Sequence, residues 1–380
     1  MIVRGGIPGS DGLLDVVLEG ERVARIEPSR EGGRCDFGGP DAYLCCGFFD
    51  PQVNGFAGVD FNGNDLTPEK FWQALRSLAS RGVTLFLPTL ITASRERMIR
   101  QLKIIVEALE GDALAREMVL GIHLEGPYIN PEDGPRGVHP REFVRPPRWE
   151  ELQELQEACR GRIRMITLAP EAQGAIPFIE KAVNRGTVVG IGHTKASEDI
   201  IEDAVRAGAS ISSHLGNGAQ GVLPRHRNPI QKQLSMDDLM ASIITDGIHL
   251  PDYVVKNFVR AKGIDRILLT TDSMAGAGAP PGIYTLGDLE VEVSPDRAAR
   301  LRGTPCLAGS ALTMDRAIAN VITFAGIDLA TAIQLASTNG RRLFPEIEPT
   351  IGPGGSANLV LFEYRGNLVV KETWIHGRRI

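Results

Sequence analysis

The middle of the chain alternates short apolar runs with longer segments of helical periodicity. Three of the longer segments, Glu69–Ser80, Arg95–Glu110 and Ser197–Ala207, are amphipathic, and Thr67 and Pro68 form a typical helix start before the first. The apolar runs, each typical of a buried strand, span residues 48–53, 83–89, 118–124, 163–169, 187–191, 210–214, 241–245 and 266–271. Strands that alternate with helices build parallel sheets. Eight such units predict an α/β fold, a (β/α)8 barrel of the TIM type.

An open, doubly wound sheet is the alternative arrangement of the same elements. Sheets of that kind bind dinucleotides through a G-x-G-x-x-G motif after the first strand. No such motif follows residues 48–53, which weakens the dinucleotide-binding version of this alternative.

The two ends of the chain have a different pattern. Short runs with strand-like alternation occur in residues 15–18 and 22–26, and again in 358–362, 368–370 and 372–375. Because chain ends often lie close together in a fold, these runs predict one small β-sandwich domain made by both ends. The expected boundaries are 1–46 and 346–380 for this domain and 47–345 for the barrel.

Composition excludes several kinds of partner. The net charge is −6 and no sustained basic run occurs, so nucleic acid and anionic membranes are not expected as main partners. No apolar run approaches the ~20 residues that cross a bilayer, and Met1–Ser10 lacks the apolar core of a signal peptide. The five cysteines are odd in number and match no zinc ribbon. We therefore expect reduced thiols and a cytoplasmic protein.

Side chains capable of catalysis follow several of the predicted strands. Glu125 follows the third run, His193 comes shortly after the fifth, His214 ends the sixth and Asp272 follows the eighth. Active sites of (β/α)8 barrels lie at the carboxyl ends of the strands, so these four side chains are expected at one rim. The same rim would carry Gln52, Asn54, Thr89, Asp246 and His249.

Glu125, His193 and His214 are candidate metal ligands. A strand-end glutamate alone is often paired with a cation, and a lone histidine is more often hydrogen-bonded than metal-bound. Two imidazoles and one carboxylate on nearby strands, however, are a typical set for catalytic zinc, which keeps a further position for water. His123 points the same way as Glu125 along its strand, so it is either a reserve ligand or, in preference, a residue behind the ligands.

Asp272 is the candidate acid and base. A carboxylate across the mouth from the metal ligands can accept a proton from water and return it to a leaving group. The alternative is an aspartate that caps the turn before the glycine-rich segment that follows. Arg225 and Arg227, after the sixth strand, suit a phosphate or carboxylate, although one of the two is expected to be an ordinary solvated charge.

Several motifs, in this order, resemble the N-acetylglucosamine-6-phosphate deacetylases of the amidohydrolase superfamily. The resemblance covers nearly the whole chain. Its motifs are Gly47–Gly55, His123–Pro127, Gly192–Thr194, His214–Leu215, Asp246–His249, Thr271–Asp272 and Leu307–Ser310.

The resemblance implies removal of an acetyl group from an amino-sugar phosphate by a metal-dependent hydrolase. It implies that Glu125, His193 and His214 hold the metal, that Asp272 is the general acid and base, and that His139 holds the acetyl carbonyl. A homodimer is also implied. Contacts to the sugar phosphate would come from Val138, Asn217, Gly218, Arg225, Asp246, His249, Cys306, Leu307 and Ala308.

One metal ion is expected, because the first strand carries Gln52 and Asn54 where many amidohydrolases carry two histidines. Amides are poor zinc ligands beside imidazole and carboxylate. Zinc is the expected ion, with iron, cobalt, manganese and nickel as alternatives.

The chain departs from the family pattern after His214. Gly216 and Ala219 replace the usual bulky residue and methionine, and the loop 223–229 lacks the usual Arg-Glu-Pro form. The motifs therefore support the deacetylation more firmly than the 6-phosphate. Hydrolysis of N-acetylgalactosamine 6-phosphate, an N-acyl amino acid or a cyclic amide is an alternative, and so is an inactive barrel that binds a sugar phosphate.

Overall fold

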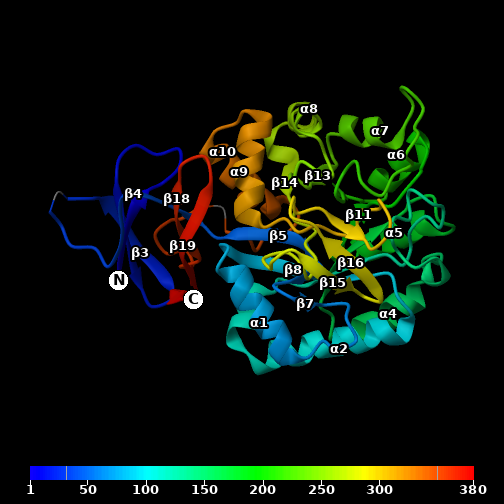
Figure 1. Cartoon of the computed structure of the whole chain (residues 1–380), viewed down its shortest axis with the longest axis horizontal. Helices are drawn as coiled ribbons and strands as arrows, with labels where there is room; N and C mark the ends of the chain where they lie inside the picture. The colour runs from blue at the N-terminus through cyan, green and yellow to red at the C-terminus, as the bar shows by residue number, and fades with distance from the viewer. Residues whose placement is uncertain (31, 349) are drawn as a thin grey trace.

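The computed structural model describes residues 1–30, 32–348 and 350–380. Among these residues, the larger part is a barrel of eight parallel strands surrounded by helices (Figure 1). Neighbouring strands pair in the order β5 (Phe48–Val53), β8 (Val83–Ile91), β9 (Ile122–Glu125), β10 (Ile163–Leu168), β11 (Val188–Ile191), β12 (Ile211–Ser212), β13 (Met240–Ile243) and β14 (Ile267–Leu269). Between β5 and β14, Val53 forms a parallel bridge with Ser273, and the Asn54 N–H donates to the Ser273 carbonyl at 2.8 Å. The predicted (β/α)8 barrel is confirmed.

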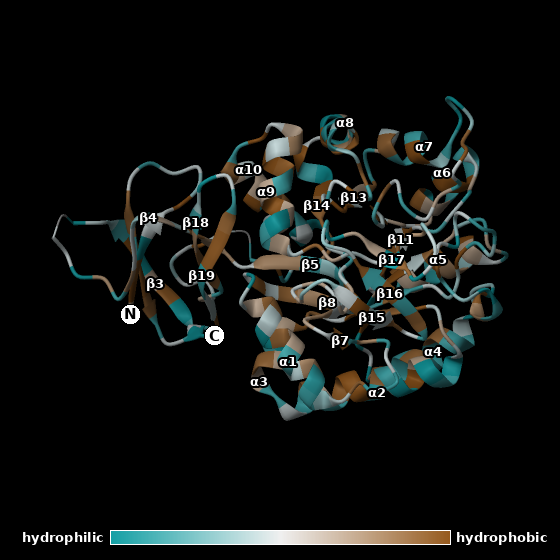
Figure 2. Cartoon of the chain, in the orientation of Figure 1, coloured by the Kyte–Doolittle hydropathy of each residue, from teal (hydrophilic) through white to brown (hydrophobic). Residues whose placement is uncertain are grey.

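The helices bury one face against the barrel, and Figure 2 shows hydrophobic and hydrophilic residues along each of them. In α1 the Thr67 hydroxyl caps the first turn by accepting the Lys70 N–H at 3.3 Å, as the sequence predicted. The helices are α1 (Pro68–Ala79), α2 (Arg95–Gly111), α3 (Ala113–Met118), α4 (Trp149–Ala158), α5 (Ala175–Val183), α6 (Glu198–Arg206), α7 (Pro229–Ser235), α8 (Asp252–Lys262), α9 (Met314–Ala325) and α10 (Leu329–Ala336), with short 3-10 turns η1 (Arg141–Phe143), η2 (Ile264–Arg266) and η3 (Thr338–Arg342).

The predicted third strand, 118–124, was wrong at its start. Met118 is the last residue of α3, whose first turn is capped by Asp112 accepting the Ala115 N–H at 2.9 Å. The strand β9 begins only at Ile122. The apolar run continues unbroken from the end of the short helix into the strand, so the hydrophobic pattern alone cannot mark the boundary.

The two chain ends form one sheet beside the barrel, as predicted, and both termini lie there in Figure 1. Its strand order is β20–β19–β18–β4–β1–β2–β3. Val23 from one edge of the sheet and Trp374 near the other edge are buried in the same apolar cluster. The sheet must therefore bend so that its two edges approach each other. The layers of the expected sandwich are thus parts of one bent sheet, and the exact domain boundaries stay predictions. The strands are β1 (Ile2–Gly6), β2 (Leu14–Glu19), β3 (Arg22–Pro28), β4 (Phe37–Cys46), β18 (Leu359–Tyr364), β19 (Leu368–Ile375) and β20 (Arg378–Arg379).

A small antiparallel sheet, not predicted, is inserted between β14 and α9. It consists of β15 (Gly282–Leu286), β16 (Leu289–Val293) and β17 (Ala299–Leu301). A two-stranded ribbon, β6 (Gly55–Phe56) and β7 (Val59–Asp60), follows β5. Within the described ranges, no helix is long and apolar enough to cross a membrane.

Candidate active site

The four central candidate side chains lie at the carboxyl end of the barrel. Glu125 is the last residue of β9, and His193 and His214 lie two residues beyond β11 and β12. Asp272 lies three residues beyond β14. His193, His214 and Asp272 have positive φ values of 52°, 32° and 48°, which are uncommon for residues other than glycine. Such strained backbone clusters at functional sites.

Glu125, His193 and His214 form a compact, buried cluster. The Oε1 atom of Glu125 lies 3.1 Å from Nε2 of His193 and 2.7 Å from Nε2 of His214. One ligand atom from each residue lies within 4.8 Å of the others, so the cluster could hold a metal ion. Ligands bound at ~2.0–2.2 Å to a tetrahedral ion are separated by about 3.3–3.6 Å, so small shifts would suffice.

The second ring nitrogen of His193 supports this assignment. Its Nδ1 lies 2.8 Å from the carbonyl oxygen of Pro135. A carbonyl only accepts hydrogen bonds, so Nδ1 carries a proton, and Nε2 is the ring nitrogen that faces the cluster and could bind a metal. Histidine ligands are usually oriented by this kind of contact.

Glu125 is ionised although it is buried. Burial by itself raises the pKa of this carboxyl, but hydrogen bonds from His193 and His214 lower it well below its usual range. Glu125 is therefore an anion in a buried site, and a buried anion needs a cationic partner.

Gln52 and Asn54 occupy the place on β5 where the sequence raised the question of further ligands. The Gln52 amide donates to Glu125 Oε1 at 2.7 Å and to Asp272 Oδ1 at 2.9 Å. The Asn54 amide donates to the same oxygen of Asp272 at 2.7 Å. Both amides present N–H groups to carboxylates, and an N–H group cannot bind a metal. The available metal ligands, Glu125, His193 and His214, thus fit one ion.

The pKa of Asp272 suits a residue that accepts and donates a proton during a reaction. Burial raises its pKa to about 6, and the negative charge of Glu125 acts in the same direction. A carboxyl with a pKa near the working pH can both accept and donate a proton.

His139 is a neutral donor beside the cluster. Burial, with the nearby His193, lowers its pKa to about 3. Its Nδ1 lies 2.8 Å from the Thr92 hydroxyl, and the Thr92 N–H points at the same atom from 3.4 Å. Nδ1 therefore accepts, and Nε2 carries the proton. That Nε2 lies 3.8 Å from Glu125 Oε2.

The rim encloses a cavity of about 130 Å³ that opens at the mouth of the barrel. His249 faces the cavity while its Nδ1 lies 2.6 Å from Asp246 Oδ2. The hydrogen bond from His249 outweighs burial and lowers the pKa of Asp246. Other expected residues on the cavity wall are Asn54, Val138, Asn217, Gly218 and Leu307.

Some predicted contacts are not brought into the cavity. Arg225 and Arg227 are exposed in the loop before α7, and Cys306 is exposed on the approach to Leu307. Ala308 is buried in the cluster beneath the inserted sheet. His123 is not in the metal cluster, because its ring nitrogens face the hydroxyls of Thr89 and Thr167 at 3.3 Å and 2.8 Å.

Sequence analysis missed Ile91, Thr92, Gly137, Leu286 and Gly309, which line the cavity or hold His139. Thr92 directly follows β8, but that strand ends at Ile91, two residues beyond the predicted run 83–89, so Thr92 was not recognised as a strand-end residue. Leu286 comes from the inserted sheet, whose pattern gave no functional signal.

Comparison with known proteins gives the class of enzyme to which the chain belongs. A model of the Amidohydrolase family matches residues 43–380. With the barrel and its rim, this match defines the chain as an amidohydrolase, a hydrolytic enzyme. The N-acetylglucosamine-6-phosphate deacetylase of Bos taurus is 33% identical, over 100% of this chain and 90% of that protein. The chain belongs to the N-acetylglucosamine-6-phosphate deacetylase family.

Two further similar proteins are also deacetylases of N-acetyl amino-sugar phosphates. The N-acetylgalactosamine-6-phosphate deacetylase of Escherichia coli O157:H7 is 33% identical over 88% of this chain and 87% of that protein. A variant of the Mycobacterium smegmatis N-acetyl-D-glucosamine-6-phosphate deacetylase, solved with N-acetyl-D-glucosamine-6-phosphate, is 27% identical. Its structure superposes with a TM-score of 0.90 and covers 100% of this chain and 98% of its own.

Proposed function

We propose that this protein hydrolyses the acetamide of N-acetylglucosamine 6-phosphate to glucosamine 6-phosphate and acetate. The observation that carries the proposal is the cluster of Glu125, His193 and His214 with Asp272 linked to it through Gln52. The family membership supplies the substrate class.

We propose that Glu125, His193 and His214 hold one divalent ion, with zinc favoured and iron, cobalt, manganese or nickel as alternatives. When bound, the ion supplies Lewis-acid activation of water and of the carbonyl. Asp272 takes a proton from the attacking water. His139 donates its Nε2 hydrogen to the oxygen that becomes negative when the carbonyl carbon turns tetrahedral.

Collapse of the tetrahedral carbon breaks the C–N bond. Asp272 returns its proton to the nitrogen, so the amino sugar leaves as an amine and the acetyl group as acetate. Asn217, Gly218, His249 and the segment from Cys306 to Ala308 are proposed to hold the sugar. Arg225 is proposed to reach the phosphate, which requires its exposed loop to fold toward the cavity.

The galactosamine epimer is a second candidate substrate, because a relative of equal identity is named for it. We further propose a cytoplasmic homodimer with this small molecule as substrate. The five cysteines are free in the described structure, which fits a reducing compartment.

The test is acetate release from a panel of N-acetyl amino sugars. It should include the glucosamine and galactosamine 6-phosphates, their unphosphorylated forms and an N-acetyl amino acid. The proposal expects the highest kcat/KM for one of the two phosphates. Release from the amino acid alone would overturn it.

A further inference from the structure

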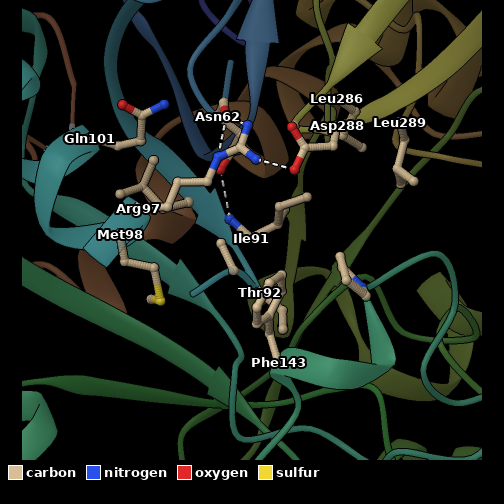
Figure 3. Close-up of a pocket in the computed structure, with 14 residues that line it drawn as sticks. Asn62, Ile91, Thr92, Arg97, Met98, Gln101, Phe143, Leu286, Asp288 and Leu289 are labelled. Carbon is tan, nitrogen blue, oxygen red and sulfur yellow. Dashed lines mark hydrogen bonds and ion pairs between the residues drawn. The ribbon is translucent and has the colours of Figure 1, made fainter. Parts of the chain in front are cut away.

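We propose that Ile91 and Leu286 form a partition that restricts the acyl group of the substrate to acetyl. The inference rests on the proposed function. Behind the catalytic cavity lies a second, small cavity of about 20 Å³, between α2, the end of β8 and the β15–β16 turn (Figure 3). Among the described residues, Ile91 and Leu286 are the two that line both cavities.

The chemistry of the catalytic cavity assigns its apolar wall to the acyl group. Its lining combines the polar side chains of the reaction with four apolar ones, and three of these, Ile91, Leu286 and Val138, form one face in the same packed cluster. An N-acetylhexosamine phosphate is covered by hydroxyl, amide and phosphate groups, and its acetyl methyl is the group that suits an apolar wall.

The position of this face agrees with the reaction. Ile91 directly precedes Thr92, whose hydroxyl lies 2.8 Å from Nδ1 of His139. His139 is the proposed donor to the carbonyl oxygen, and the acyl methyl is attached to that same carbonyl carbon. The partition therefore starts beside the place where the acyl chain must begin.

Hydrogen bonds hold the partition in place. The Ile91 N–H donates to Asn62 Oδ1 at 2.9 Å, and the Gly287 N–H, next to Leu286, donates to Asp60 Oδ2 at 2.8 Å. Arg97 donates to the Asn62 carbonyl and pairs with Asp288 in the turn (Figure 3). These hydrogen bonds fix the backbone of the partition, and the side chains of Ile91 and Leu286, 6% and 3% exposed, are held by the packing around them.

Shortening the partition would supply most of the room for a longer acyl chain, because the second cavity behind it is small. Behind the partition it is lined by apolar side chains that include Leu90, Met98, Phe143 and Leu289. No step of the proposed reaction uses them. Truncation of Leu286 to alanine removes three carbon atoms from the partition, which would join the two cavities beside the acyl carbonyl.

The experiment compares kcat/KM for N-acetyl, N-propanoyl and N-butanoyl glucosamine 6-phosphate. Wild-type protein should lose about 10-fold or more for each added methylene, the lower end of the effect in a closed apolar pocket. Leu286→Ala should raise the butanoyl-to-acetyl ratio by about 10-fold or more, and Ile91→Ala should raise it in the same direction. Because both substrates are measured on one preparation, the ratio is independent of the fraction of active protein.

Leu289→Ala is the matched control. It makes the same chemical change in the same hairpin, but Leu289 lines the second cavity alone, so the ratio should stay within about twofold of wild type. In the Leu286→Ala background, Ala93→Met should fill the second cavity and return the ratio toward wild type.

Each outcome decides the proposal. If wild-type protein releases acetate and Leu286→Ala leaves the ratio unchanged, or Leu289→Ala changes it equally, the partition is wrong and the deacetylase stands. Equal turnover of all three acyl groups by wild type would also overturn the partition. If wild type hydrolyses none of the three, the proposed function fails and the inference with it.

Discussion

One amide links the two carboxylates of the site. The Gln52 side chain donates to both Glu125 and Asp272. The two carboxylates are thus neighbours in a buried site, where the charge of one makes ionisation of the other harder. Burial raises the pKa of Asp272 to about 6 and the charge of Glu125 adds to the effect, while Glu125, held by two histidines, stays ionised.

Replacing Asp272 by asparagine should separate proton transfer from metal binding. Asp272→Asn keeps the shape of the side chain but cannot take a proton. We expect an unchanged fold, nearly full metal content and a loss of about 10²-fold or more in kcat. Acetate release and elemental analysis on the same sample measure both. A variant that loses its metal yet works normally once the metal is restored would show that Asp272 is not the base.

Arg225 is the residue on which the proposed phosphate preference depends. An arginine that binds a remote phosphate adds about 1.5–3 kcal/mol through a charged hydrogen bond. Arg225→Ala should therefore lower kcat/KM for the 6-phosphate by roughly 10- to 100-fold and leave the unphosphorylated sugar almost unaffected. Arg227→Ala, in the same exposed loop, is the control. If wild type treats both sugars alike and neither variant changes their ratio, the phosphate assignment is wrong.

The sequence was sufficient to place the residues that stand at the ends of the barrel strands. Glu125, His193, His214 and Asp272 were predicted because each follows an apolar run, and parallel strands bring their ends together. The orientation of Arg225 was not predictable, since an exposed loop with few hydrogen bonds has no pattern that fixes its direction. The contact of Thr92 with His139 was missed because it joins two loops 47 residues apart.

Gly218, in the loop after β12, packs against the ring of His193. Gly218 has a φ of +56°, and a Cβ atom there would lie 2.8 Å from Nδ1 of His193. Gly218→Ala should thus push His193 away from the Pro135 carbonyl and add about 1–2 kcal/mol of backbone strain. We expect metal affinity to fall by roughly 10- to 100-fold.

Gly221→Ala is the matched control for this change. Gly221 lies in the same loop outside the left-handed region, and an added Cβ would meet nothing within 4 Å. Metal titration by calorimetry, with circular dichroism as the check on folding, should separate the two variants. Equal affinities for both would show that the contact of Gly218 with His193 has no role in the site.

Elements were predictable where a period was sustained. The helices α1, α2 and α6 and the barrel strands were found because their hydrophobic patterns are regular. The helix α3, of six residues, was missed because one and a half turns show no clear period. The inserted sheet was missed because its short strands follow a glycine-rich segment. Leu286, the residue of this sheet that lies between the two cavities, was therefore missed as well.

At the scale of the molecule, each part has a distinct place around the site. The barrel brings residues from six strand ends, distant in sequence, to one cavity. The inserted sheet forms a wall of that cavity, and the sheet from the chain ends lies away from it, beside α10 and the barrel (Figure 1). The barrel thus provides the chemistry, and the insertion shapes the substrate space.

The most direct test of the account is a metal titration of activity. Protein stripped by a chelator is titrated with zinc while acetate release from N-acetylglucosamine 6-phosphate is measured. With Glu125, His193 and His214 as one site, and the amides of Gln52 and Asn54 excluding another, we predict a linear rise that stops at one ion per chain. A plateau at two ions, or no acetate at any zinc concentration, would contradict the account.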